Sequence, residues 1–589
     1  MVERIATDVL VVGGGGAGLT ASMLLSTMGI DHHLVSSLPT TSVLPKAHVL
    51  GQRAMEVLED CGAANAIYAV GTPPEQFART AFYAGVAGHE LAGSKLFIQE
   101  SWGGGGADPD WVAASPKLTT NLPQIRLEPI MKARAEELAP GRINFHHEVV
   151  SVTQDDRGVL AFVRDHDRGV DYEVAALYLM ACDGGRSVGR MVGIELEGLA
   201  ELGRTATFHL RADFSGLMGD PDVLLRWVFC PSNAKMVVLA PMGPTRWGAD
   251  SEEWVAHINY DLNDERAHDD EAVMADLREA LGIPDHPLEV LMLTRWVVGG
   301  VLADRFREGR VFVLGDAAHR HPPTGGLGLV SAIHDAQNLC WKLALVLRGQ
   351  AGDELLDTYE AERRVVDARN LQRSLENAMG YGIMAAALDF FPDRSVEDRW
   401  ASLARCLGDA PEDAAFRREI RNLMAAQSQE FREHDVEYNY SHRSSAVVED
   451  GTTAPELQNL RSYVPSTRPG SPLPHAWLED DRFERCSTLD LVAVDRFTLI
   501  AGEDGEAWKD AAREVGAALG LTIDAYTVGH SDGDLRDPRL RFEQVRGFGR
   551  GGAVLVRPDR CVAFRAMDAA DDPVGVLRSA LQQILSRSA

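Results

Sequence analysis

The sequence predicts a mixed α/β fold in which a three-layer dinucleotide-binding βαβ domain carries an inserted β-sheet domain and a small carboxy-terminal α/β domain. Three observations predict it. A buried β-branched strand runs into a glycine turn and an apolar helix near the amino end, strand-like alternation fills the middle, and a second buried strand leads into a long apolar helix. A chain of 589 residues is too long for one hydrophobic core, so several domains are expected.

Composition and charge narrow the class of protein. The chain is 45% hydrophobic and 25% charged, which is typical of a globular enzyme. Its net charge of -29 would repel a phosphate backbone, so we expect no nucleic-acid partner. The 7 cysteines form no CxxC pair and no metal-ligand spacing, which favours a cytoplasmic location and no metal site. Glycines interrupt the apolar stretch 9–25, and no other run reaches the roughly 20 residues of a membrane span, so no membrane segment is expected.

The first βαβ unit consists of a strand at 8–12, a helix expected over 19–28 and a strand at 33–35. The turn between the first strand and the helix has GxGxxG spacing, and in this context helix N–H groups can face a pyrophosphate. We therefore expect dinucleotide contacts at the turn residues Gly13, Gly15, Gly16, Ala17 and Gly18.

The acid that usually ends the second strand and binds the ribose hydroxyls is absent. Ser36 and Ser37 occupy its place and are expected to substitute for it weakly. The first motif alone therefore leaves the identity of the dinucleotide open.

The middle of the chain predicts an inserted sheet that faces a substrate. Alternating apolar residues over 145–183 are followed by strand patterns at 205–212, 224–228, 235–239 and 290–298. The chain then returns to the dinucleotide fold through a buried strand at 311–314 and a long helix at 328–348.

The last third contains helices and a further small domain. Residues 355–439 read as amphipathic helices, which suit either a subunit contact or plain packing. A stretch rich in Pro and Gly at 465–474 marks a boundary, followed by a strand at 497–500, a helix at 506–519 and a strand at 553–556. This order suggests a thioredoxin-like domain, which lacks a redox cysteine pair.

Two further motifs follow buried strands, and both combine an acid with glycines that allow close backbone approach. They are Ala181-Cys-Asp-Gly-Gly-Arg-Ser-Val-Gly-Arg190 and Gly315-Asp-Ala-Ala-His-Arg-His-Pro-Pro-Thr-Gly-Gly-Leu-Gly-Leu329. With them the sequence resembles the class A flavoprotein aromatic hydroxylases, most of all the phenol monooxygenase branch, over nearly the whole chain. The resemblance is also carried by Pro45-Lys-Ala-His48, Gln52-Arg53-Ala-Met-Glu56, Leu122-Pro-Gln124, Leu127-Glu-Pro129 and Tyr359-Glu-Ala-Glu-Arg-Arg364.

The resemblance implies FAD as the bound cofactor and NADPH or NADH as a transient co-substrate. Asp316 would bond the ribitol chain, Asp183 would serve the pyrophosphate and the approach of the reductant, and Gln124 would bond the FAD chain. The glycine-rich helix start after Pro322 would face the isoalloxazine, where the positive end of the helix stabilises anionic reduced flavin. Further implied FAD contacts are Lys46, Gln52, Arg53, Gly184, Gly326, Gly328 and Leu329.

The sequence also departs from the family pattern. Lys46 replaces an Arg, which keeps the charge but loses the planar fork. Val330 and His334 replace an Asn and a Gln, which puts a flavin contact at those positions in doubt.

The resemblance further implies a reaction. NAD(P)H reduces FAD, O2 adds to flavin C4a, and a hydroxyl passes to a phenolic ring, ortho to its own hydroxyl. His48 is the first candidate for the group that takes the phenol proton, because its titration range suits proton exchange, and Asp213 is the second. Three alternatives stay open: a hydroxylase of larger polyketide phenols, an FAD-dependent reductase or oxidase, and a flavoprotein that binds FAD or a ligand without turnover.

The expected domain organisation follows from these assignments. The FAD-binding domain takes residues 1–85, 131–195 and 301–380, with a substrate-domain and FAD-contact segment at 86–130. The substrate-binding sheet takes 196–300, a helical linker and subunit contact takes 381–465, and the thioredoxin-like domain takes 466–589. A homo-oligomer, either a dimer or a tetramer, is expected.

Overall fold

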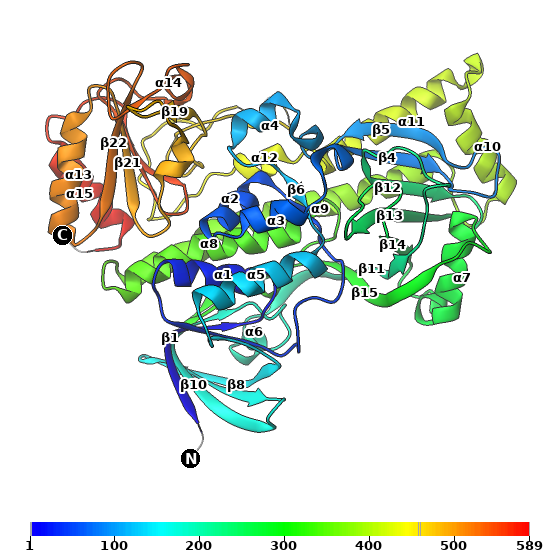
Figure 1. Ribbon diagram of the computed structural model, residues 1–589, viewed down its shortest axis with the longest axis horizontal. Helices are drawn as coiled ribbons and strands as arrows, with labels where there is room; N and C mark the ends of the chain where they lie inside the picture. Colours follow the sequence, from blue (N-terminus) through cyan, green and yellow to red (C-terminus); the bar gives the residue numbers. More distant parts are fainter. Residues whose placement is uncertain (1–2, 457–458, 460, 588–589) are drawn as a thin grey trace.

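The structure is a computed structural model that describes residues 3–456, 459 and 461–587 (Figure 1). Two 8-stranded sheets, one 7-stranded sheet and a two-stranded ribbon make up its β-structure. The ribbon pairs β3 (Val49–Leu50) with β6 (Thr120–Asn121). The mixed α/β class that the sequence predicts is confirmed.

The first sheet has a parallel core with the strand order β17-β10-β1-β2-β7. The core strands are β1 (Arg4–Val12), β2 (His32–Ser36), β7 (Ile143–Phe145), β10 (Val170–Ala181) and β17 (Val311–Val313). The short strand β16 (Arg307–Glu308) flanks β17, and the hairpin β8 (His147–Asp155) and β9 (Gly158–Asp165) extends β10. The buried strands predicted at 8–12, 33–35 and 311–314 are thus all present.

Helices α1 (Gly16–Thr27), α5 (Gln124–Leu138) and α8 (Leu327–Leu347) pack beside this sheet. α1 begins earlier than the helix predicted over 19–28, because the last residues of the glycine turn already form its first turn. α8 matches the helix predicted at 328–348 closely. Shorter helices lie around them, namely α2 (Gln52–Asp60), α3 (Ala64–Val70), α4 (Pro109–Ala114) and α6 (Val188–Met191).

The register of the first sheet brings three motifs to one edge. Val12 of β1 pairs with Ala181 of β10, and Ala181 pairs with Val313 of β17. Parallel strands in this register leave the sheet at the same level, so the glycine turn, the Asp183 turn and the Asp316 turn emerge side by side. Ligands of open parallel sheets bind at this carboxyl edge.

The second sheet has the order β18-β15-β11-β14-β13-β12-β4-β5. Its strands are β4 (Arg79–Ala84), β5 (Ser94–Glu100), β11 (Leu196–Arg211), β12 (Val223–Cys230), β13 (Lys235–Gly243), β14 (Glu253–Tyr260), β15 (Glu289–Ala303) and β18 (His319–Arg320). The four strands predicted between 205 and 298 correspond to β11, β12, β13 and β15, and the first prediction, 205–212, extends one residue beyond β11. β4, β5 and β14 were not predicted.

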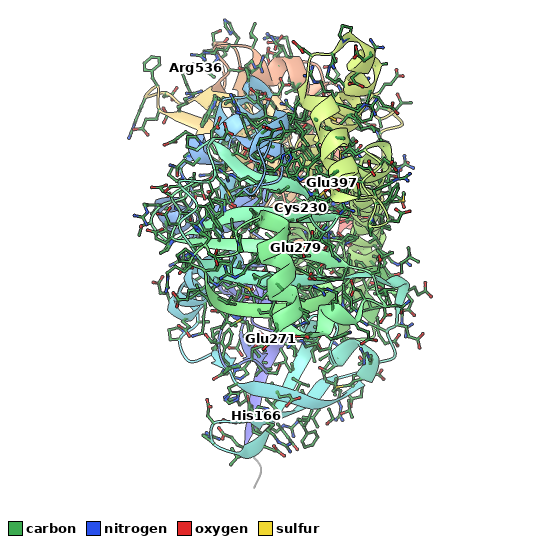
Figure 2. All side chains as sticks on the ribbon, turned by 90° about the vertical axis from the view of Figure 1, so that its right-hand side faces the viewer. His166, Cys230, Glu271, Glu279, Glu397 and Arg536 are labelled. Atoms are coloured by element: carbon green, nitrogen blue, oxygen red, sulfur yellow. The ribbon has the colours of Figure 1, made fainter. Side chains whose placement is uncertain are left out.

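Each face of the second sheet is covered. α7 (Asp270–Leu281) packs on one face through a buried apolar cluster (Figure 2). The labelled Glu271 and Glu279 lie on the solvent side of that helix. Over β4 and β12, the other face contacts the helices α9 (Thr358–Ala387), α10 (Val396–Leu407) and α11 (Ala414–Ala426). The helices predicted over 355–439 are therefore packing helices, and their role as a subunit contact stays a prediction.

The third sheet belongs to the carboxy-terminal part of the chain, coloured orange to red in Figure 1. Its order is β20-β19-β23-β22-β21-β24-β25, with β21 (Phe497–Gly502) parallel to β22 (Ile523–Gly529) and antiparallel to β24 (Ala553–Val556). The other elements are β19 (Trp477–Glu479), β20 (Arg485–Ser487), β23 (Leu535–Arg536), β25 (Val562–Ala566), α13 (Glu506–Leu519), α14 (Arg541–Arg546) and α15 (Pro573–Ile584). The predicted strands and helix are confirmed, and the thioredoxin-like assignment stays a prediction.

The carboxy-terminal part packs directly against the rest of the chain. Its apolar core is continuous with that of the first sheet, and Trp341 of α8 meets the ring of Phe497 edge to face, with centroids 5.9 Å apart. All 7 cysteines lie in the described part of the chain and none of them is disulfide-bonded. Among the described helices, none is both long enough and apolar enough to cross a membrane.

Candidate cofactor and substrate site

The glycine turn after β1 has the geometry of a phosphate site. A Cβ at Gly13 would overlap the backbone carbonyl of Cys182, and a Cβ at Gly18 would overlap the carbonyl oxygen of Gly13. Gly15 is the N-cap residue of α1, and no side chain caps the first turn of the helix. The N–H groups of Gly16, Ala17 and Gly18 thus have no intrahelical partners and suit an anionic ligand.

The start of α8 lies next to this turn. A Cβ at Gly16 would overlap a methyl group of Leu329, which places the two helix starts against each other. Gly326 caps α8 with φ 68 and no side-chain cap, and nothing lies within 4 Å of a Cβ placed at Gly326 or Gly328. Gly326 and Gly328, two of the expected FAD contacts, therefore adjoin open space. Pro322, which precedes them in the chain, is buried.

The two acidic turns behave differently. Asp316 is exposed in the short helix Gly315–Ala317, and among the described residues none donates a hydrogen bond to its carboxylate. Asp183 instead accepts hydrogen bonds from the N–H groups of Gly185, Ser187 and Val188. Asp316 is free to bond a ligand, whereas the Asp183 carboxylate holds its own turn in place, leaving open space at Gly184.

Asp316→Ala is expected to raise the dissociation constant for FAD by about 10- to 100-fold, since hydrogen bonds to a charged group contribute about 1.5–3 kcal/mol. The protein should purify with little yellow cofactor, and titration of apoprotein with FAD measures the loss. Asp156→Ala, which removes an exposed acid from the turn between β8 and β9, is the matched control. Full FAD occupancy in the Asp316 variant would defeat the role assigned to that carboxylate.

The loop around Lys46 is held against the start of α5. The N–H of Gln124 donates to the carbonyls of Pro45 and Ala47, both at 2.9 Å, and its side-chain amide donates to Glu128. Lys46 is exposed with φ 44. The Gln124 side chain thus supports Glu128, and the exposed ammonium of Lys46 can reach a ligand.

Glu128 is a residue that sequence reasoning missed as a site residue. Its Oε2 accepts the N–H of Ser42 at 2.6 Å, and its Oε1 lies 3.5 Å from a Cβ placed at Gly15. Burial raises its pKa. At the end of β2, Ser36 is buried and Ser37 exposed. A carboxyl thus reaches the glycine turn from α5 and not from β2, and only the motif Leu127-Glu-Pro129 signalled it.

The structure does not bring the side chains of Gln52 and Arg53 to the glycine turns. The Gln52 amide donates to the carbonyls of Trp111 and Lys117 at 2.9 and 2.8 Å. The Arg53 guanidinium pairs with Glu56 at 2.7 Å and also donates to the hydroxyl of Tyr440 and the carbonyl of Asp559. Both side chains are buried in protein contacts, so the geometry gives them a structural role in place of the expected FAD contact.

A pocket opens to solvent beside the start of α8. Its lining includes Gly51, Trp111, Gly326, Val330 and His334. Val330 and His334, two of the three positions that depart from the family pattern, thus both line it. Burial holds the pKa of His334 well below its ordinary value, so this imidazole is neutral.

His48 has a defined hydrogen-bond partner. Its Nδ1 lies 2.6 Å from Oδ1 of Asn121, and the Asn121 amide in turn donates to Thr72 at 2.6 Å. Because that oxygen only accepts, Nδ1 of His48 carries the proton and its Nε2 keeps a free lone pair. Burial lowers the pKa of His48, although the bond to Asn121 opposes the shift. The ring is a neutral acceptor at pH 7.

Three polar side chains of the second sheet, Thr207, His257 and Trp296, form a polar wall, and His257 lies near His48. Thr207 of β11 and His257 of β14 are paired residues that alternate with the apolar side chains facing α7, so they face the other way. Thr207 Oγ1 lies 2.8 Å from His257 Nδ1 and accepts from Trp296 Nε1 at 2.9 Å. Burial and the proximity of His48 lower the pKa of His257 to about 4. Sequence reasoning missed this wall, because the strand pattern does not reveal which face meets a ligand.

Asp213 does not lie beside His48, Thr207 and His257. It lies in an exposed turn beyond β11, where Oδ1 accepts the N–H of Ser215 at 2.9 Å. At about 3.3 Å per residue it stands roughly 20 Å along the strand from Thr207. Hydrogen bonds from Ser215 lower its pKa. The structure supports a surface turn residue and not a substrate base.

These features define a flavin-type dinucleotide site. Two uncapped helix starts, glycines that tolerate no side chain, open space at Gly184 and Gly328, and a free carboxylate at Asp316 fit the pyrophosphate, ring and ribityl hydroxyls of FAD.

Comparisons with known proteins identify the family. Residues 6–374 match the FAD binding domain model, and residues 466–588 match the model "Aromatic-ring hydroxylase, C-terminal". The chain therefore belongs to the family of FAD-binding aromatic-ring hydroxylases, and FAD is its cofactor.

Individual relatives cover the whole chain. It is 35% identical to 2,4-dichlorophenol 6-monooxygenase of Delftia acidovorans, over 99% of this chain and 98% of the relative. It is 33% identical to phenol 2-monooxygenase of Pseudomonas sp. (strain EST1001), over 99% and 93%. A crystal structure of the flavin-dependent monooxygenase PieE in complex with FAD and substrate superposes with a TM-score of 0.90 at 37% identity, over 99% of this chain and 100% of that one.

Proposed function

We propose that this chain is a flavin-dependent monooxygenase that hydroxylates a phenol ortho to its hydroxyl group, using NAD(P)H and O2. The observation that carries the proposal is the His48–Asn121 hydrogen bond, which leaves Nε2 of His48 as a neutral acceptor. The names of the relatives, 2,4-dichlorophenol 6-monooxygenase and phenol 2-monooxygenase, support a phenolic substrate. The expected homo-oligomer stays a prediction.

The protein residues divide the work. FAD, when bound, supplies the two-electron and oxygen chemistry. A phenol has a pKa of about 10 and is neutral at pH 7. Nε2 of His48 accepts the phenol proton and raises the electron density at the ortho carbon. His257 and Thr207, neutral and fixed by Trp296, line the substrate side and position the ring.

His48→Ala is expected to keep FAD reduction by NADPH while losing most of the hydroxylated product, with peroxide formed instead. General acid–base groups contribute about 10²- to 10⁴-fold, so the hydroxylation rate should fall by at least the lower figure. NADPH consumption, peroxide and product are measured on the same samples. His268→Ala, at an exposed histidine, is the matched control.

The pH profile adds a second readout. The neutral form of His48 is present above its pKa, and burial lowers that pKa below the ordinary 6.5. Product yield in the unmodified protein should therefore hold steady as the pH falls through 6.5. If the His48→Ala variant gave the same product yield as the unmodified protein at every pH, His48 would have no part in the mechanism.

Substrate class and reaction class are tested together with a panel of phenols under labelled O2. Substituted single-ring phenols and larger polycyclic phenols are offered with NADPH or NADH, and the product mass and hydroxylation position are determined. Incorporation of one labelled oxygen ortho to the hydroxyl supports the proposal. Peroxide with no oxygenated product across the panel favours a reductase or oxidase, and absence of flavin reduction favours a binding protein.

A further inference from the structure

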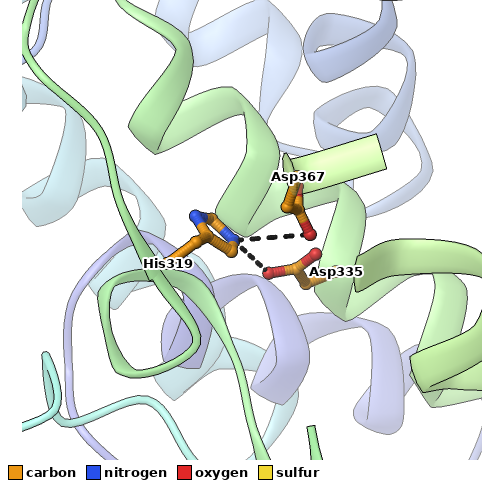
Figure 3. A group of neighbouring side chains, drawn as sticks. All are labelled: His319, Asp335 and Asp367. Atoms are coloured by element: carbon orange, nitrogen blue, oxygen red, sulfur yellow. Dashed lines mark hydrogen bonds and ion pairs between the residues drawn. The ribbon is translucent and has the colours of Figure 1, made fainter. Parts of the chain in front are cut away.

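Beneath the Asp316 turn lies a buried cluster that the mechanism does not use. His319, Asp335 of α8 and Asp367 of α9 come together there with their side chains pointing toward one another (Figure 3). All three side chains are fully buried. Asp335 is the centre of the cluster, because it bonds His319, Arg363 and also the backbone of the turn.

The contacts of Asp335 are specific. Its Oδ2 accepts the N–H of Gly315 at 2.9 Å and the Nε2–H of His319 at 2.8 Å. Its Oδ1 accepts from Nε of Arg363 at 2.8 Å. The carboxylate therefore ties the backbone amide directly before Asp316 to two side chains that belong to other elements.

Protein groups balance the charge of the cluster. Arg363 also donates to Oδ1 of Asp367 at 2.8 Å, so its guanidinium bridges the two carboxylates. Burial opposes protonation of His319, but Asp367 and Asp335 outweigh it and raise its pKa to about 9. His319 and Arg363 hold the pKa of Asp335 below its ordinary value in spite of burial, so Asp335 is anionic. Burial, together with the nearby Asp335, raises the pKa of Asp367 to about 7.

The turn itself is tightly placed. Gly315 has φ 57, and a Cβ there would lie 3.0 Å from Cβ of Ala332 in α8 and 3.3 Å from Cβ of Ala17 in α1. The turn lies in close contact with α1 and α8, so it can tilt only if the hydrogen bond from the N–H of Gly315 to Asp335 is lost. The direction of the exposed Asp316 carboxylate therefore depends on the hydrogen bond between Gly315 and Asp335.

We propose that Asp335 and His319 are positioning residues, which hold the turn Gly315–Ala317 so that Asp316 meets the ribityl chain of FAD. The proposal rests on the role proposed for Asp316. Asp367 belongs to the same cluster and is equally buried, but it has no contact with the turn among the described residues, so it offers a control that is matched in burial and residue type.

The first test measures FAD binding to apoprotein by fluorescence titration for Asp335→Asn and Asp367→Asn, together with thermal unfolding of each apoprotein. Both variants should unfold at a lower temperature, because each removes a buried carboxyl group that accepts a hydrogen bond from Arg363. Only Asp335→Asn should weaken FAD binding, by about tenfold, equivalent to about 1.4 kcal/mol. Equal weakening in both variants, or none in Asp335→Asn, would overturn the proposal.

A double-mutant cycle separates positioning from general support. If Asp335 acts through Asp316, the double variant Asp316→Ala with Asp335→Asn binds FAD no more weakly than Asp316→Ala alone. Additive losses would contradict positioning. Unchanged binding in Asp316→Ala alone would instead defeat the role of Asp316, so the two failures are distinguishable.

A second pair of variants keeps the test usable if Asp335→Asn does not fold. His319→Gln retains an N–H donor toward Asp335 and should keep FAD affinity close to that of the unmodified protein. His319→Leu removes the donor at similar volume and should weaken FAD binding. Identical FAD affinities in the two His319 variants would remove His319 from the positioning role.

Discussion

Arg557→Met is expected to lower the free energy of unfolding by about 3–5 kcal/mol, because it leaves buried carboxylates without their main partner. Arg557 is fully buried and donates to both oxygens of Glu362, at 2.6 and 2.8 Å, and to Asp559 at 3.0 Å. Glu362 lies on α9 and also binds Lys342 of α8 at 2.9 Å. The cluster thus joins the carboxy-terminal part to the helices beside the first sheet.

Chemical denaturation of the whole protein measures this effect. Arg513→Met is the control, since Arg513 is exposed and pairs with the exposed Asp510 at 2.8 Å, and surface ion pairs contribute about 0–1 kcal/mol. If both variants lost a similar amount of unfolding free energy, the buried cluster around Arg557 would stabilise the protein no more than a surface ion pair does.

The pH dependence has a definite sign. Burial acts to raise the pKa of Glu362, but Arg557 and Lys342 outweigh it and hold that pKa well below the ordinary 4.5. A carboxyl group with a depressed pKa adds stability above its unfolded pKa and loses it as the pH falls. The difference in stability between the unmodified protein and Arg557→Met should therefore narrow below about pH 4.5.

The elements that the sequence predicted are those whose signals are local. The buried strands, the glycine turn and the helix at 506–519 follow from short patterns, and the structure has each of them. β4 was not predicted, and only one of its two partners is local: it pairs with β5, but Phe82 also pairs with Trp227 of β12 across a long stretch of chain. No local pattern reveals which distant strand completes a sheet edge.

The same limit applies to the candidate site. Arg53 reads as a cofactor contact in its motif, but its acceptors include Asp559, which lies 506 positions away in the sequence. Glu128 and Asp335 reach the turns at Gly15 and Gly315 from helices whose docking is a tertiary event. Residue type and spacing predicted the backbone turns, whereas the side chains that support those turns required the folded chain.

Gly18→Ala is expected to weaken FAD binding strongly, because the new Cβ would overlap the carbonyl oxygen of Gly13. That carbonyl has little freedom to move, since the N–H of Gly13 is bonded to Val35 at 2.7 Å and its Cα faces Cys182. Overpacking of this kind costs about 1–3 kcal/mol, so FAD affinity should fall by up to about 100-fold.

Gly382→Ala provides the matched control, because Gly382 lies within α9 and nothing is within 4 Å of a Cβ placed there. Alanine is favoured over glycine by about 1 kcal/mol inside a helix, so this variant should be as stable as the unmodified protein or more stable. The ratio of flavin absorbance to protein absorbance after purification compares the two directly. Since both changes add one methyl group, normal flavin content in Gly18→Ala would mean that α1 can shift away from β1, and the phosphate site would then not depend on this close approach.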